Sequence, residues 1–144
     1  MIKRLMVLFS VCGLALLSQQ PRGLSQAQKA NIINSLKGSP AASVGIGANG
    51  CASLAECRSL ATDFSNTFAS AQWRVTEITI SNVLNGRHGI FLGHYSDASM
   101  GIRYRAVKGA LTAAAISFTE IAIDPPVKSN RPDNDAPLIL VGPQ

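Results

Sequence analysis

The segment that most restricts the fold lies between residues 53 and 80, where a helix pattern runs directly into a strand pattern. Ser53 and Glu56 have the spacing of a capping box, in which each side chain binds a backbone N–H at the start of a helix. Residues 73–80 (WRVTEITI) alternate and are rich in β-branched side chains, which predicts a strand. The helix predicted at 53–71 carries one apolar stripe, formed by Cys57, Leu60, Ala61, Phe64, Phe68 and Ala71.

The same order of patterns occurs twice in the chain. A β-prone run at residues 43–47 precedes the helix at 53–71. A second set follows, with a strand at 88–95, a helix at 99–114 and a strand at 116–123. The apolar side of this last helix is expected at Met100, Tyr104, Val107, Leu111 and Ala114.

Three further segments complete the order of elements. Ser25 and Gln28 form another capping box, which predicts a first helix at 26–37 with Ala30, Ile33 and Leu36 on its apolar side. Residues 124–137 are rich in proline and polar residues, which is typical of a loop. Residues 138–142 (LILVG) form a continuous apolar run, as expected of a strand buried on both faces.

These patterns predict one α/β domain over residues 25–144, with a mixed sheet of four to five strands in the order helix, βαβ, βαβ, strand. Asn85-Gly86 is a strong turn pair, and a turn there would join strands 73–80 and 88–95 as a hairpin. The hairpin favours a ferredoxin-like split of the strands over a doubly wound sheet. The chain length of 144 residues has room for one core.

The first twenty residues have the layout of an export signal. Lys3 and Arg4 precede an apolar run from Leu5 to Leu17, which is shorter than a membrane-spanning helix needs. Residues 1–20 are therefore predicted to be a signal peptide or, because small residues are poorly placed for cleavage, an uncleaved membrane anchor. The basic head favours a domain in the periplasm over an anchored, cytoplasm-facing form. Acylation at Cys12 is disfavoured because the cysteine lies in the middle of the apolar run.

Two cysteines remain in the exported part, and we expect Cys51 and Cys57 to form a disulfide. An even pair in an oxidising compartment is more often a disulfide than a metal site. A chain that bends into the helix start at Ser53 brings the two positions close together. A reactive Cys51 thiolate near a helix N-terminus is the competing interpretation. If the domain is not exported, we expect two buried, inert thiols instead.

Residues 45–50 (GIGANG) have the G-x-G-x-x-G spacing of a dinucleotide-binding loop. We expect this pattern to be a strand-to-helix turn, because a short run precedes Gly45, the helix begins three residues after Gly50, and no acidic residue lies about twenty positions further on. A small ligand- or nucleotide-binding protein, or an enzyme, that uses Gly45, Gly47 and Gly50 remains the alternative function.

Other chemistry is weakly indicated. His88 and His94 are about 20 Å apart on an extended strand, which is too far for both to bind one metal ion. No serine stands in a G-x-S-x-G motif. We therefore predict no metal, cofactor or catalytic residue. Arg103, Arg105 and Lys108 form a basic edge that is either a binding surface or a solvated helix face. The net charge of +5, of which Lys3 and Arg4 supply two, is too mild and scattered to predict nucleic-acid binding.

Several stretches resemble known domains. SLKGSPAASVGIG, FASAQWRV, ALTAAAISF and LILVGPQ are similar to small α/β domains that follow an N-terminal membrane segment in bacterial proteins, over roughly residues 25–144. GRHGIFLGHYSDAS is more distantly similar to peptidoglycan-binding SPOR domains. Neither resemblance implies an activity or a functional residue. The chain length, the export signal and the absence of a catalytic motif together predict a non-catalytic cell-envelope module that binds a protein, glycan or lipid partner.

Overall fold

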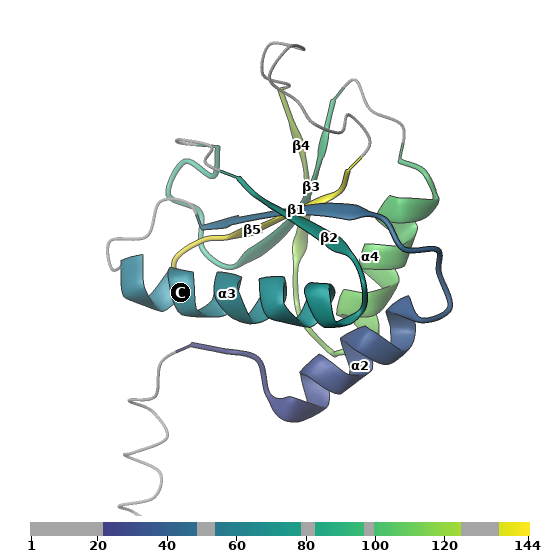
Figure 1. Ribbon diagram of the computed structural model, residues 1–144. Coiled ribbons are helices and arrows are strands. Elements are labelled where there is room, and N and C mark those ends of the chain that lie inside the picture. The colour runs from purple at the N-terminus through teal and green to yellow at the C-terminus, as the bar shows by residue number, and fades with distance from the viewer. Residues whose placement is uncertain (1–21, 49–53, 79–82, 97–99, 125–135) are drawn as a thin grey trace, which may run out of the picture.

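The computed structural model describes residues 22–48, 54–78, 83–96, 100–124 and 136–144. In these ranges the chain is an α/β protein with helices on one face of a five-stranded mixed sheet (Figure 1). The elements are α2 (Gln26–Leu36), β1 (Ser43–Ala48), α3 (Leu54–Ser70), β2 (Arg74–Glu77), β3 (Ile90–Tyr95), α4 (Ile102–Ala113), β4 (Thr119–Ile123) and β5 (Leu138–Val141).

The strand order is β2-β1-β5-β3-β4. Each βαβ unit forms a pair of adjacent parallel strands, β1 with β2 and β3 with β4. The last strand, β5, joins the two units, since it pairs in parallel with β1 and antiparallel with β3. The predicted α/β class and the mixed sheet are thus confirmed.

The expected hairpin and the ferredoxin-like split are wrong. Asn85 and Gly86 do form a turn, with φ of 49° and 75° and a hydrogen bond from the Arg87 N–H to the Leu84 carbonyl. That turn lies within the β2–β3 connection, and β5 and β1 separate the two strands. A ferredoxin-like split would also place a strand between β1 and β2, which here are direct neighbours.

The strand order follows from how apolar each strand is. All four residues of β5 are buried, so this strand takes the central position, where both faces are covered. The two edge strands, β2 and β4, each have exposed residues. Pairing β2 directly with β3 is incompatible with this order, in which β1 and the central β5 lie between them. The doubly wound alternative needs helices on both faces, whereas the described helices all pack on one.

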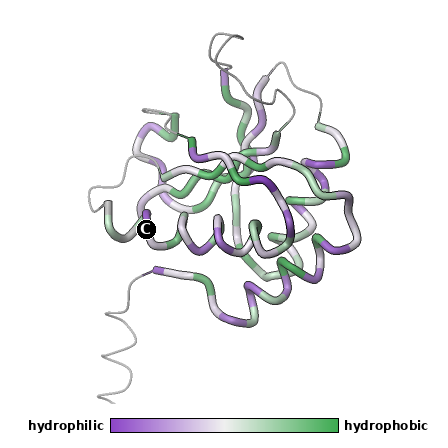
Figure 2. The backbone as a smooth tube through the Cα atoms, viewed as in Figure 1, coloured by the Kyte–Doolittle hydropathy of each residue, from purple (hydrophilic) through white to green (hydrophobic). Residues whose placement is uncertain are grey.

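The larger core lies between the sheet and the helices. Sheet residues Val44, Ile46, Leu92, Ile139 and Val141 contribute to it, and helix residues include Ile32, Leu36, Phe64, Phe68, Val107 and Leu111. Figure 2 shows hydrophobic residues concentrated on the central strands, with hydrophilic residues recurring along the helices. A smaller core on the other sheet face contains Leu84, Phe91, Tyr95, Ile123, Leu138 and Leu140.

The helix patterns are confirmed in type and corrected in detail. The capping box of α2 is present, because Ser25 Oγ accepts from the Gln28 N–H and the Gln28 side chain accepts from the Ser25 N–H. Its buried residues are Ile32 and Leu36 rather than Ala30 and Ile33, since α2 packs against both α3 and α4. Ser53 and the side chain of Glu56 lie outside the described residues.

The apolar side of α4 was predicted correctly except at its first position. Tyr104, Val107, Leu111 and Ala114 are buried, as expected. Met100 is 55% exposed, because the helix begins only at Ile102, after the N-cap residue Gly101.

Candidate functional site

A surface hollow of about 540 Å³ lies where the end of α3 and the first turn of α4 meet the starts of β1 and β2. We call it the arginine hollow. Its wall is formed by residues 41–43 of the α2–β1 connection, by Ala69 and Gln72 at the end of α3, by Trp73 and Arg74, and by Arg103 in the first turn of α4.

The end of α3 positions this wall. Gln72 has a left-handed backbone with φ of 67°, and the next residue, Trp73, returns its N–H to the Phe68 carbonyl at 3.0 Å. This pair of features is a Schellman-type ending, which turns the chain sharply out of a helix. As a result Trp73 turns into the core, where it is 3% exposed, while Arg74 stays on the surface.

Two arginines line the arginine hollow. Arg74 and Arg103 bring guanidinium groups from two different elements, and no carboxylate lines the hollow within the described ranges. Ser43 and Gln72 add a hydroxyl and an amide. The indole Nε1 atom of Trp73 is buried and has no hydrogen-bond partner among the described residues, which is unusual for a buried donor.

The opposite end of α3 holds the start of the described chain. We call residues 22–24 the N-terminal arm. Arg22 Nη1 donates a 2.6 Å hydrogen bond to the carbonyl of Gly142, and the Leu24 N–H donates to the Asp63 carboxylate at 2.9 Å. Figure 1 shows the C-terminus beside the first turns of α3 as well. The N-terminal arm and the C-terminal segment are therefore fastened together at one end of the domain.

Cys57 lies at this same end, in the first turns of α3. It is fully buried, and its Sγ atom lies 3.5 Å from the Gly142 carbonyl oxygen. Cys51 lies outside the described residues, so the disulfide between the two stays a prediction.

Gly45 and Gly47 lie inside β1 rather than at a strand-to-helix turn. A Cβ atom on Gly45 would come within 2.3 Å of the Ile78 side chain, and one on Gly47 within 2.4 Å of the Ile78 carbonyl oxygen. Both glycines thus make room for Ile78, the residue that follows β2. Gly50 lies outside the described residues.

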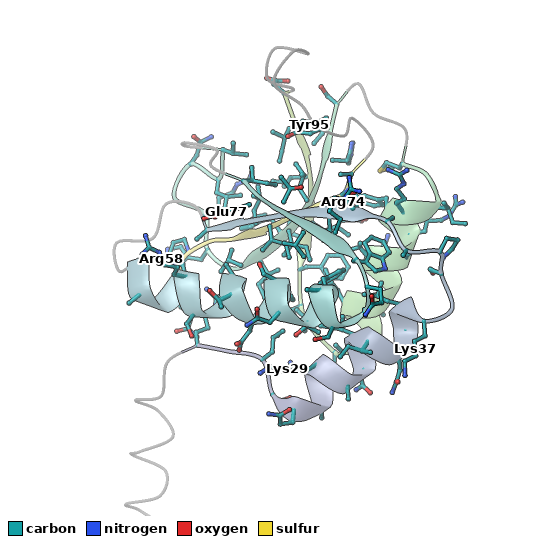
Figure 3. The ribbon with its side chains drawn as sticks, in the orientation of Figure 1. Lys29, Lys37, Arg58, Arg74, Glu77 and Tyr95 are labelled. Carbon is teal, nitrogen blue, oxygen red and sulfur yellow. The ribbon has the colours of Figure 1, made fainter. Side chains whose placement is uncertain are left out.

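The basic residues predicted on α4 have different neighbours. Arg103 lines the arginine hollow with Arg74, whereas the Lys108 ammonium lies 3.1 Å from the Glu120 carboxylate of β4. Arg105 is exposed. In Figure 3, Arg58 marks the first turns of α3, while Arg74 and Lys37 lie toward the opposite end of that helix.

The two histidines occupy separate environments. His88 is exposed, and its Nδ1 atom contacts the backbone carbonyl of Gln144. His94 is half-buried, its Nδ1 lies 3.0 Å from the Tyr95 carbonyl oxygen, and its ring packs edge-on against Tyr104. Within the described part of the chain, no group of three His, Cys, Asp or Glu residues is placed to hold a metal ion.

A polar cluster of Tyr104, Lys108 and Glu120 joins α4 to the edge strand β4. The Tyr104 hydroxyl donates a 2.8 Å hydrogen bond to Glu120 Oε1. Burial, and then this hydrogen bond, raises the pKa of Tyr104 above its ordinary value of 10.0. The hydrogen bonds from Tyr104 and then Lys108 lower the pKa of Glu120 below its ordinary value of 4.5.

These shifts predict two losses of stability. The folded state stabilises the ionised form of the Glu120 carboxyl. The contribution of Glu120 to the free energy of unfolding is therefore complete above the ordinary pKa of 4.5 and is lost as pH falls through the lower pKa of the folded state. The folded state keeps Tyr104 protonated, so stability falls as pH rises above 10.0, where the unfolded tyrosine ionises.

The variant Tyr104→Phe tests both directions. It removes the hydroxyl, so we expect a weaker dependence of the unfolding free energy on pH above 10 and a Glu120 pKa closer to its ordinary value. Denaturant unfolding at several pH values and an NMR titration of the Glu120 carboxyl carbon measure the two effects. A Glu120 carboxyl that titrates alike in both proteins would contradict the assignment.

Sequence patterns missed the residues of the arginine hollow other than Arg103. Trp73 and Arg74 follow the helix directly, and no motif spacing links them to Arg103 on the second βαβ unit. The sequence feature that could have indicated Trp73 and Arg74 is the direct passage from the helix pattern to the strand pattern at Gln72. A residue there must reverse the chain and so places its neighbours at the helix end.

The chain matches no protein-family model, no curated protein and no solved structure. The resemblance to small α/β domains behind a membrane segment therefore stays an expectation. Among the described residues, none of the helices is long and apolar enough to span a membrane.

Proposed function

We propose that the chain is a non-catalytic module of the cell envelope, delivered outside the cytoplasm by residues 1–20, that binds its partner at the arginine hollow. The observation that carries the proposal is that Arg22 binds Gly142 beside Cys57, in the first turns of α3, whereas the arginine hollow lies at the other end of that helix. A 17-residue helix is about 25 Å long, so attachment and binding are well separated.

The N-terminal arm supports the membrane-side orientation. Four residues, 18–21, separate the apolar run from Arg22, and they span at most about 14 Å. In the anchored form, the end of the domain that carries the arm and Gly142 lies next to the membrane. The arginine hollow then points away from it, toward soluble or wall-bound partners. In the cleaved form the same hollow is free in the periplasm.

The disulfide between Cys51 and Cys57 belongs to the same proposal. Cys57 is buried beside Gly142, whose carbonyl also binds Arg22, so a bridge there braces the end of the domain that follows the signal segment. A small disulfide ring of this kind contributes about 2 kcal/mol. The resemblance to small domains behind an N-terminal membrane segment further supports a location outside the cytoplasm.

The test of location is the intact mass of the full chain recovered from expressing cells, alkylated before or after reduction. We expect Cys51 and Cys57 to be alkylated only after reduction, and the protein to fractionate with the periplasm or the membrane. A variant with Lys3→Glu and Arg4→Glu is the control, because it removes the positive head that orients the segment. Free thiols in the wild-type chain and in this control alike would contradict delivery outside the cytoplasm.

A further inference from the structure

We infer that two copies of this chain associate through the outer edge of β4, as antiparallel strands related by a two-fold axis at Ile121. This pairing joins the two five-stranded sheets into one continuous sheet, with the helices of both copies on the same face. The described lining of the arginine hollow includes no residue of β4. The inference therefore goes beyond the proposed function, and either can fail alone.

The backbone of β4 directs hydrogen-bonding groups away from the sheet at this edge. The Ser96 N–H donates to the Ile123 carbonyl at 2.9 Å, so Ile123 directs its backbone groups toward β3. Neighbouring residues of a strand direct these groups to opposite sides, so Glu120 and Ala122 direct theirs away from β3. Within the described ranges, no strand pairs with β4 on that side. An edge of this kind is a template for pairing with another chain.

The other edge of the sheet is better protected against pairing. The edge strand β2 has four residues, and its first and last, Arg74 and Glu77, are charged and exposed. Charged side chains on a short edge strand oppose association. The edge strand β4 has five residues and no proline, and its one charged side chain, Glu120, lies 3.1 Å from the Lys108 ammonium. We therefore assign the contact to β4.

A two-fold axis at Ile121 suits the backbone and the smaller core. Glu120 of each copy then lies opposite Ala122 of the partner copy, and each of these pairs exchanges two backbone hydrogen bonds. The two Ile121 residues become direct neighbours, with their Cα atoms about 4.5 Å apart. In one copy Ile121 is half-buried and packs against the smaller core. Association therefore extends that core across the axis.

Charge complementarity favours a second copy over an unrelated strand. Glu120 points toward α4, because its carboxylate accepts from the Tyr104 hydroxyl and lies beside the Lys108 ammonium. Ala122 lies on the same face of the sheet, since side chains alternate along a strand. Across the axis the two Glu120 carboxylates are diagonal neighbours, each opposite a small alanine. Two carboxylates and two Lys108 ammonium groups then form one cluster whose charges balance.

The experiment is sedimentation velocity of the purified full chain over a range of concentrations, with amide hydrogen exchange measured at the lowest and the highest. We expect a monomer–dimer equilibrium and slower exchange of the Glu120 and Ala122 amides at high concentration. Amide exchange separates this contact from association through residues 1–20, which would leave both amides unprotected.

Two substitutions at Ala122 should change association in opposite directions. Ala122→Glu places a carboxylate opposite Glu120 of the partner copy, twice in each dimer, and should raise the dissociation constant about fivefold or more. Ala122→Lys places an ammonium there and should lower the constant by a similar factor. Ala122 is exposed, so the fold tolerates both changes, and thermal unfolding of each variant checks this. Glu77→Lys is the matched control on the other edge strand and should associate like the wild-type chain.

The results distinguish a second copy from other occupants of the edge. Opposite effects of the two Ala122 variants, with the control unchanged, support the inference. A monomer at every concentration overturns it, as does a dimer in which the Glu120 and Ala122 amides exchange freely. Equal weakening by both Ala122 variants, or weakening by Glu77→Lys, also overturns it. Protection of the two amides only when envelope material is added to a monomeric chain would show that a different partner pairs with β4.

Discussion

Replacing Phe68 with alanine is expected to lower the free energy of unfolding by about 3–5 kcal/mol. Phe68 is fully buried in the core between α3 and the sheet. Removing the ring loses its burial, leaves a cavity that close-packed neighbours fill only in part, and breaks the edge-on contact with Trp73. The same change loosens the inner wall of the arginine hollow.

Denaturant unfolding followed by circular dichroism measures this loss, and Trp73 fluorescence reports the local change. We expect the emission of the folded variant to shift to longer wavelength, since the indole gains access to water. Thr62→Ala is the control, because Thr62 is exposed on the same helix, and it should alter stability by less than about 0.5 kcal/mol. A loss below about 1 kcal/mol for Phe68→Ala would show that Phe68 is not packed as described.

Replacing Gly47 with alanine is expected to cost about 1–3 kcal/mol, although alanine restricts the unfolded chain more than glycine does. The new Cβ atom would come within 2.4 Å of the Ile78 backbone oxygen. A flexible side chain can swing away from such a contact, but a backbone carbonyl cannot. Ile78 must therefore shift away from Gly47.

Gly109→Ala is the matched control for that substitution. Gly109 is exposed within α4, and a Cβ atom there meets nothing within 4 Å. Alanine should stabilise the helix by about 0.5–1 kcal/mol, opposite in sign to Gly47→Ala. Thermal or denaturant unfolding of both variants compares the two signs. A Gly47→Ala chain as stable as the wild type would contradict the close approach of the Ile78 carbonyl to Gly47.

The elements of this fold could be predicted from the sequence, whereas the order of the strands could not. Capping residues and apolar spacing identify α2 and α3 because those signals are local. Strand order depends on competition among strands far apart in the chain. The Asn85-Gly86 turn forms as predicted. It does not decide which strands pair, because β5, the last strand in the chain, lies at the centre of the sheet and separates β1 from β3.

The glycine pattern at residues 45–50 shows the same limit for site prediction. Its spacing is that of a phosphate-binding loop, but Gly45 and Gly47 are placed by packing against Ile78. The arginine hollow shows the reverse case, a surface feature that no sequence motif predicts. Its residues carry no motif, because Arg74 and Arg103 are brought together only when the two βαβ units join through β5.

The most direct test of the proposed binding module is the binding of the purified full chain to isolated cell-wall and membrane fractions. The wild-type chain, the Arg74→Gln/Arg103→Gln double variant and Arg105→Gln are compared by sedimentation. We predict saturable binding that the double variant loses and that Arg105→Gln retains. Equal binding of all three proteins, or no binding of the wild-type chain to either fraction, would contradict the proposed function.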